Sequence, residues 1–338
     1  MHSILGINFI WAAMPPVNQS TRSSLIGIEG TRHEPTEFPP QVGPPRGVLQ
    51  ADTPRGTAFS HQRIAPPSEL APWVQHYWHV QWDLRYAPPS NAETLPHPNC
   101  YLVFEHDLER PCDDVSVFTR AEVSGVNTGK FSRVMKGYGR VFGLKFKPGG
   151  LRPFLDASVF TLTDRVVPAA QVFGQSVLKL AAQLRSLETP EAMAVATTEY
   201  FALDLPAHDT QVDLSSQLVE TIFGDPSILT VEALARRSGL SVRSLQRLFR
   251  VYVGVPPKWV IRRYRLHELL ERLNSGDAFN GAEVALDLGY ADQAHLINDF
   301  RRLADYTPKQ YVRRALTQSK LRSDQRNGYP HSSAIRLV

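Results

Sequence analysis

Two segments in the C-terminal third of the chain share one pattern of apolar and polar positions. Each begins with a short apolar stripe at helical spacing, reaches a glycine, and continues with a second apolar stripe. Gly239 and Gly289 lie 50 residues apart, and Phe249 and Phe300 lie 51 apart. A repeat of this length indicates two copies of one supersecondary unit.

Each copy predicts a helix, a tight turn and a second helix. Thr230 is suited to cap the first helix, because its hydroxyl can accept a free backbone N–H. Gly239 is expected to end that helix, since glycine adopts the left-handed conformation without a clash at Cβ. Ser241 and Asp292 are the expected caps of the two second helices. The pattern is that of a helix-turn-helix, whose second helix can enter a DNA major groove.

The segment between the two units predicts one long helix, Lys258–Asn274. Its length is roughly 25 Å at the rise of an α-helix. With the body of each unit added, this helix can set two recognition helices about one DNA turn, ~34 Å, apart. A helical bundle without DNA binding is the alternative, and the duplication disfavours it. The apolar face is expected to hold Trp259, Leu266, Leu269, Leu270 and Leu273, with Arg262, Arg263, Arg265 and Arg272 elsewhere.

The residues of the two units resemble those of AraC/XylS-type transcriptional regulators. The first match is Ala-Arg-Arg-Ser-Gly-Leu-Ser-x-Arg-x-Leu-Gln-Arg-Leu-Phe, from Ala235. The second is Leu-Gly-Tyr-Ala-Asp-Gln-Ala-His-Leu-Ile-x-Asp-Phe-Arg-Arg, from Leu288, followed by Tyr-Thr-Pro-x-Gln-Tyr. The resemblance covers about the last third of the chain. It implies two helix-turn-helix units joined by a long helix, an N-terminal sensing or dimerisation domain, and contact with RNA polymerase.

Candidate base-reading residues follow from the spacing on the second helix of the first unit. The stripe opposite the apolar one carries Arg243, Gln246, Arg247 and Arg250. In the major groove, Arg forms hydrogen bonds with guanine and Gln forms them with adenine. By resemblance, base-contacting positions are occupied by Arg243, Gln246 and Arg247. In the second unit they are occupied by His295 and Asn298, and Asn298 stands where the family often has Arg. A solvated basic face is the plainer interpretation. The complete set of DNA-binding candidates is Ser241, Arg243, Ser244, Gln246, Arg247, Arg250, Gln293, His295, Asn298, Arg301 and Arg302.

The distribution of charge supports DNA binding by the C-terminal part. Residues 221–338 hold 19 Lys and Arg against 11 Asp and Glu, whereas the remainder holds 18 against 22. The first unit, between Thr230 and Lys258, contains six basic residues and one acidic residue. The second unit, between Gly281 and Lys309, contains three basic and five acidic residues. The first unit is therefore expected to carry most of the affinity. The alternative is that the acids of the second unit point away from DNA or cap its helix.

The whole chain has the composition of an ordinary globular protein. It is 338 residues long, 42% hydrophobic and 21% charged, without an apolar run near the ~20 residues of a membrane span. Cys100 and Cys112 form no disulfide framework or metal spacing, which favours a cytoplasmic location. Residues 1–60 contain eight prolines and six glycines, which is typical of a disordered extension. Leu5–Met14 is too short and lacks the basic flank of a signal peptide.

The region between residues 61 and 215 predicts a β-rich domain with a helical tail. Alternation over Trp73–Trp82 indicates a strand with Val74, His76, Trp78, Val80 and Trp82 on one face. Leu-Ala-Pro-Trp-Val and Phe-Lys-Pro-Gly-Gly resemble the N-terminal regions of some AraC-type regulators, and a β-barrel is suspected. The further expected elements are strands at Cys100–Glu105, Val115–Phe118 and Arg140–Phe146, a helical start at Leu151–Leu155, and helices at Gln171–Leu187 and Glu191–Leu203.

Three motifs in this region carry weaker functional interpretations. Gly125–Lys130 resembles a phosphate loop but is one residue short, and Phe131 replaces the magnesium-binding hydroxyl. His76 and His79 face opposite sides of a strand, so a shared metal is not expected. The aromatic residues around Trp78 are expected in the core rather than in a ligand pocket. We expect no metal and no cofactor.

The sequence as a whole predicts an α+β protein that regulates transcription by binding double-stranded DNA and is not an enzyme. The expected parts are a disordered extension (1–60), a β-rich sensing or dimerisation domain (61–215), a double helix-turn-helix domain (216–318) and a flexible tail (319–338). A small-molecule effector and a homodimer are left open, and no membrane contact is expected. The alternative is a metal- or ligand-binding β-barrel enzyme with an accessory helical domain, or a protein-interaction module.

Overall fold

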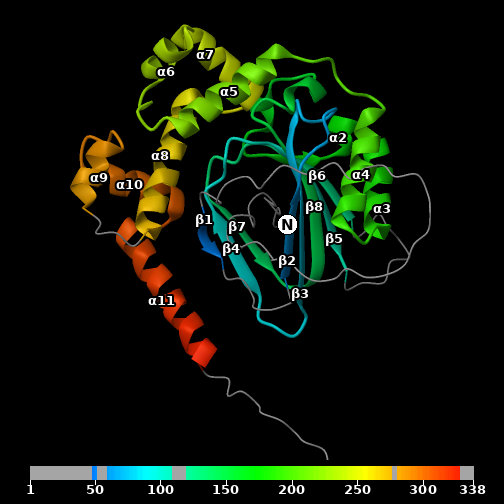
Figure 1. Cartoon of the computed structure of the whole chain (residues 1–338), viewed down its shortest axis with the longest axis horizontal. Helices are drawn as coiled ribbons and strands as arrows, with labels where there is room; N and C mark the ends of the chain where they lie inside the picture. The colour runs from blue at the N-terminus through cyan, green and yellow to red at the C-terminus, as the bar shows by residue number, and fades with distance from the viewer. Residues whose placement is uncertain (1–47, 52–58, 109–118, 276–279, 328–338) are drawn as a thin grey trace, which may run out of the picture.

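A β-rich domain and a chain of helices make up the structure, a computed structural model that describes residues 48–51, 59–108, 119–275 and 280–327 (Figure 1). The described strands form two antiparallel sheets, with the orders β1-β4-β7 and β2-β3-β8-β5-β6-β9. The strands are β1 (Val48–Ala51), β2 (Phe59–Ile64), β3 (Val74–Leu84), β4 (Ser90–Thr94), β5 (Tyr101–Asp107), β6 (Thr119–Ser124), β7 (Phe131–Met135), β8 (Gly137–Phe146) and β9 (Val166–Pro168).

The helices follow the last long strand, β8, and the order is interrupted only by β9. They are η2 (Arg152–Phe154), η3 (Val159–Leu162), α2 (Ala170–Phe173), α3 (Ser176–Ser186), α4 (Pro190–Ala202), α5 (Thr210–Gly224), α6 (Val231–Ser238), α7 (Val242–Leu248), η4 (Phe249–Val253), α8 (Pro257–Asn274), α9 (Gly281–Asp287), α10 (Gln293–Ala304) and α11 (Pro308–Asn327). The α+β class is confirmed. The strand expected at Val115–Phe118 lies outside the described residues.

The suspected barrel is not closed in the described part of the chain, because its strands divide into two stacked sheets. A core lies between them, to which β3 contributes Trp78 and Trp82 and β7 contributes Phe131 and Met135. Each sheet thus buries one face against the other, as in a sandwich. The aromatic strand residues are core, as expected.

The face expected for Val74 was wrong. The pairing of β3 with β8 is irregular between Val74 and His76, so the alternation shifts by one residue there. Val74 therefore joins Tyr77 in a second core, whereas Trp78 lies in the core between the sheets.

This second core lies on the outer face of the six-stranded sheet, which α3 and α4 cover (Figure 1). Tyr77 of β3 and Thr198 of α4 form a hydroxyl–hydroxyl hydrogen bond of 2.8 Å. Arg140 of β8 donates to backbone carbonyls at the C-terminal end of α3, where helical carbonyls lack partners. The helix expected at Gln171–Leu187 is divided into α2 and α3, because Gly174 adopts a φ of 72°.

The cores continue into the C-terminal helices. Ile64 and Phe142 of the sheet belong to the same cluster as Leu234 and Phe249 of the helical region. A separate cluster joins α8, α9 and α10 and includes Leu95 of the β-rich domain. The described helices therefore pack on the β-rich domain instead of standing apart from it.

Candidate nucleic-acid interface

The first unit folds as the sequence predicts. Thr230 accepts a hydrogen bond from the backbone N–H of Ala233 at 3.1 Å and so caps α6. Gly239 ends that helix with a φ of 70°, a left-handed conformation that favours glycine. Ser241 then accepts from the N–H of Ser244 at 3.1 Å and caps α7. The local sequence thus sets the turn that orients α7.

One face of α7 is buried and the other is exposed. Leu245 of α7 and Phe249, the first residue of the following turn η4, are fully buried on the inner face. The outer face is formed by the four residues of the predicted stripe, which are all exposed: Arg243, Gln246, Arg247 and Arg250. Beyond Leu248 the helix continues as the π-helical turn η4, which ends at Gly254.

The second unit repeats this arrangement. Asp292 caps α10 by accepting from the N–H of His295 at 2.7 Å, and the His295 ring packs edge-on against Tyr290. Leu296 and Phe300 are fully buried on the inner face of α10. The exposed face carries the remaining candidates, Gln293, His295, Asn298, Arg301 and Arg302.

The acids of the second unit have structural partners. Asp299 is buried on α10 and accepts hydrogen bonds from Arg262 of α8, from the Tyr290 hydroxyl at 2.9 Å and from Arg302 at 2.9 Å. Burial alone would raise the pKa of the Asp299 carboxyl, but the bonds and charge of Arg262 outweigh it and hold that pKa below its usual value. The negative balance counted in the sequence therefore overstates the negative charge that faces solvent.

Two further acids are also paired. Asp287 forms an ion pair of 3.0 Å with Arg272 of α8, and Asp305 forms one of 2.9 Å with Lys130 of the β-rich domain. Arg302, a candidate for DNA contact, is itself engaged by Asp299. Among the described residues, Arg301 is the arginine of α10 without an ion pair.

The connecting helix α8 fixes the two units relative to each other (Figure 1). Arg265 of α8 donates to the carbonyl of Leu229, which precedes α6, and at 3.5 Å to the carbonyl of Gly289 in the second turn. Gly289 has a φ of 71°, and a Cβ there would lie 2.8 Å from a Leu229 methyl group. The turn of the second unit thus packs against Leu229, the segment that leads into α6 of the first unit.

Comparison with known proteins identifies this architecture. Residues 234–314 match the family HTH_18, described as a helix-turn-helix domain, and residues 62–168 match DUF6597, a domain of unknown function. A protein of Escherichia coli (strain K12) named as an HTH-type transcriptional regulator, YkgA, is 32% identical over 88 residues. The C-terminal part of the chain is an AraC-type helix-turn-helix domain. The match spans 25% of this chain and 36% of the length of that relative.

Solved structures of ToxT from Vibrio cholerae resemble the chain loosely. One ToxT structure at 1.65 Å resolution is 11% identical, with a TM-score of 0.33, over 76% of this chain and 98% of ToxT. Another ToxT structure, with an unsaturated fatty acid bound, is 11% identical with a TM-score of 0.31. The match covers 77% of this chain and 96% of ToxT. No helix among the described residues has the length and apolar character needed to traverse a lipid bilayer.

The AraC-type domain contacts the β-rich domain through a buried arginine. Arg263 of α8 is 1% exposed and donates to the carbonyls of Thr128 and Gly129, in the segment that resembles a phosphate loop. Burial lowers the pKa of its guanidinium to about 9. The position expected for Arg263, away from the apolar face, was wrong. It lies three residues before Leu266 and seven before Leu270, so helical spacing alone places it on the buried face.

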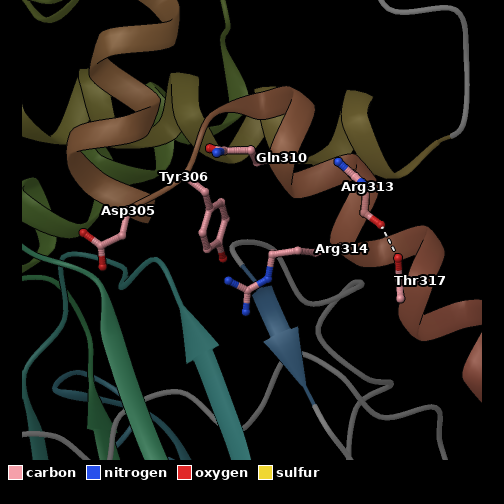
Figure 2. Close-up of a pocket in the computed structure, with 6 residues that line it drawn as sticks. All are labelled: Asp305, Tyr306, Gln310, Arg313, Arg314 and Thr317. Carbon is pink, nitrogen blue, oxygen red and sulfur yellow. Dashed lines mark hydrogen bonds between the residues drawn. The ribbon is translucent and has the colours of Figure 1, made fainter.

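A second contact lies beside the second helix-turn-helix unit (Figure 2). Lys130 pairs with Glu93 of β4 and with Asp305, and the Tyr306 hydroxyl donates to Glu93 at 3.3 Å. Figure 2 shows Arg314 of α11 directed towards the Tyr306 ring, 4.8 Å from its centre. Asp305, Tyr306 and Arg314 border a cleft of about 540 Å³ where α11 leaves the body of the protein.

A third contact reaches the recognition helix itself. The Arg250 guanidinium lies 3.8 Å from the centre of the Phe160 ring in η3, and the Ser158 hydroxyl donates to the Arg250 carbonyl at 2.7 Å. Thr163 donates to the carbonyl of Gly254 at 2.6 Å. Arg250 is therefore exposed but is held by the β-rich domain. Sequence periodicity could not reveal this contact, because the partners lie about 90 residues apart.

Proposed function

We propose that this protein is a sequence-specific transcription regulator that reads two major grooves of double-stranded DNA with α7 and α10. The observation that carries the proposal is the exposed stripe of α7, formed by Arg243, Gln246 and Arg247. Arginine pairs with guanine and glutamine with adenine in the major groove. The capped and buried inner side of α7 holds this stripe in a fixed orientation, as base recognition requires.

The candidate residues divide into base-reading and phosphate-binding groups. Besides the α7 stripe, His295 and Asn298 are proposed to read bases, since they occupy the equivalent exposed face of α10. Ser241, Ser244 and Gln293 lie at helix N-termini, where phosphate groups bind favourably. Arg250, Arg301 and Arg302 supply positive charge at the ends of the recognition helices.

The proposed division of labour assigns residues 216–318 to DNA binding and residues 61–215 to assembly and to the response to a small-molecule effector. Residues 1–60 and 319–338 have no assigned role, although β1 and the start of β2 lie in the first range and α11 extends into the second. The boundary between residues 215 and 216 falls inside α5, so a DNA-binding fragment should start near residue 208. We further propose a cytoplasmic protein without catalytic activity, which contacts RNA polymerase and acts as a homodimer.

The decisive experiment maps bound DNA across the genome of the source cell and then measures affinity for the recovered sequence. We expect one motif, with an affinity that falls steeply with salt because phosphate contacts release counterions. Equal affinity for the motif and for random DNA would overturn base reading. The absence of salt-dependent binding would favour a protein-interaction module, and stoichiometric metal in the purified protein would favour a β-domain enzyme.

A further inference from the structure

A cleft of about 850 Å³ opens on the helical side of the β-rich domain, away from the DNA-binding candidates. Its volume falls within the range of small-molecule sites. The cleft lies between η2, α2, α3 and α4, and the segment after α4 closes one end.

The floor of this cleft is aromatic. The rings of Phe154, Phe173 and Phe201 pack edge-to-face with centres 5.3–5.7 Å apart. Tyr200 extends the surface, and its hydroxyl is fixed by a hydrogen bond of 3.1 Å to the carbonyl of Phe173. Such a surface favours the apolar body of a ligand and, through the ring faces, a cation.

The rim of the cleft carries more acid than base. Asp156, Glu199 and Asp204 border it and are exposed, whereas Lys179 is its one basic residue. In the described part of the chain, none of the three carboxylates forms an ion pair within 4.0 Å. The rim therefore repels anionic ligands and attracts cationic ones.

The cleft is connected to the recognition helix by one short segment, residues 152–160. At one end of it, Phe154 belongs to the floor of the cleft. At the other end, Ser158 and Phe160 hold the backbone and the guanidinium of Arg250. A ligand on Phe154 therefore touches the same segment that holds a DNA-binding candidate.

We propose that this cleft binds an amphipathic organic cation, an apolar body with an ammonium group, and that the bound cation weakens DNA binding. The proposal rests on the function proposed above. A ligand that fits the observed cleft stabilises the conformation in which Phe160 holds Arg250, since a ligand shifts a population towards the state it binds. By linkage, DNA that recruits Arg250 must weaken binding of the cation by the same factor.

Calorimetry on the full chain tests the binding site. Benzyltrimethylammonium is the cationic probe, and phenylacetate is the anionic probe with the same ring. We expect the cation to bind and the anion not to bind. The double variant Glu199→Gln, Asp204→Asn should lower the affinity for the cation by about tenfold, because two attractive charges are lost. Glu220→Gln, an exposed change on α5, is the control and should have no effect. Equal binding of both probes, or no binding of the cation, would overturn the proposal.

Fluorescence anisotropy with labelled DNA tests the coupling. Saturating benzyltrimethylammonium should lower DNA affinity by about fivefold or more. Phe160→Leu should abolish that effect while the cation still binds, since Phe160 is 39% exposed and its replacement leaves the core intact. An unchanged or increased DNA affinity would refute the coupling. Failure of the free protein to bind any DNA would instead refute the proposed function, and the calorimetric result would stand separately.

Discussion

Asp299 lies on a recognition helix, yet its side chain is only 2% exposed and is bound by Arg302 of the same helix, by Tyr290 of the preceding turn and by Arg262 of α8. Its role at the residue scale is to hold α10 against α8, not to meet DNA. Removing its charge leaves Arg262 and Arg302 without their common partner. Buried hydrogen bonds to charged groups have a larger effect on stability than those between neutral groups.

We therefore expect Asp299→Asn to lower the free energy of unfolding by about 2 kcal/mol at pH 7. Because the pKa of Asp299 is lowered in the folded protein, its contribution is complete above the unfolded pKa of about 4 and is lost as the pH falls through the folded value. Urea unfolding at pH 7 and pH 3 measures this. The control Asp287→Asn breaks an exposed pair and should cost less than about 1 kcal/mol. If Asp299→Asn lowered the free energy of unfolding equally at both pH values, the stabilising role of the Asp299 charge would be contradicted.

At the same scale, Arg247→Ala tests base reading by α7. Loss of a bidentate contact to guanine should cost about 1–3 kcal/mol and relax the preference at one base pair. Competition binding against sites with single base changes measures both effects. Arg237→Ala, an exposed change on α6, is the matched control and should leave the preference intact. An equal loss on all sequences would assign Arg247 to a phosphate.

At the scale of the element, α7 and α10 differ in the charge that they offer to DNA. On α7, Arg243 and Arg247 form no ion pair with described residues. On α10, Arg302 is paired with Asp299, which it shares with Arg262, and Arg301 is the arginine that forms no ion pair among the described residues. The first unit therefore offers more unpaired positive charge than the second, as the charge count from the sequence predicts. This holds although most of the acidic residues in that count have structural partners.

We expect the double variant Arg243→Ala, Arg247→Ala to weaken DNA binding by a larger factor than His295→Ala, Asn298→Ala. Phosphate neutralisation supplies much of the affinity, and the first pair removes two charges. Affinity measurements together with a footprint of each variant test this, with protection strongest over one half of the site. Similar losses from the two pairs would refute the asymmetry.

At the scale of the whole molecule, the AraC-type domain and the β-rich domain share buried surfaces. Gly254, with a φ of 93°, lies so close to η3 that a Cβ there would be 3.0 Å from a methyl group of Val159. Arg263 and Lys130 form further contacts across the same boundary. These contacts couple the stability of the DNA-binding part to the β-rich domain.

A fragment of residues 208–338 should keep the sequence preference of the full chain but unfold at a lower temperature. The preference depends on α7 and α10, which the fragment retains, whereas Val253 and Val255 lose part of their buried environment. Motif selection from random DNA and thermal unfolding measure the two effects. A different motif would show that the β-rich domain takes part in base reading.

The sequence by itself determined the features that depend on near neighbours. Thr230, Gly239, Ser241 and Asp292 predicted their caps and turns, because capping involves atoms within three or four residues. The exposed stripe of α7 followed from helical periodicity in the same way. The repeated pattern predicted the double unit and its connecting helix, and the family resemblance added the base-contacting positions.

The tertiary structure decided what depends on residues far apart in the chain. Arg263 meets a carbonyl 135 residues away, and Phe160 meets Arg250 across a domain boundary. The bulge that moves Val74 to the other face arises from pairing with β8, and the two-sheet arrangement arises from pairings between distant strands. Local propensity cannot specify such contacts, because burial of a charge or a choice of sheet face is stable only when the complete set of neighbours is present.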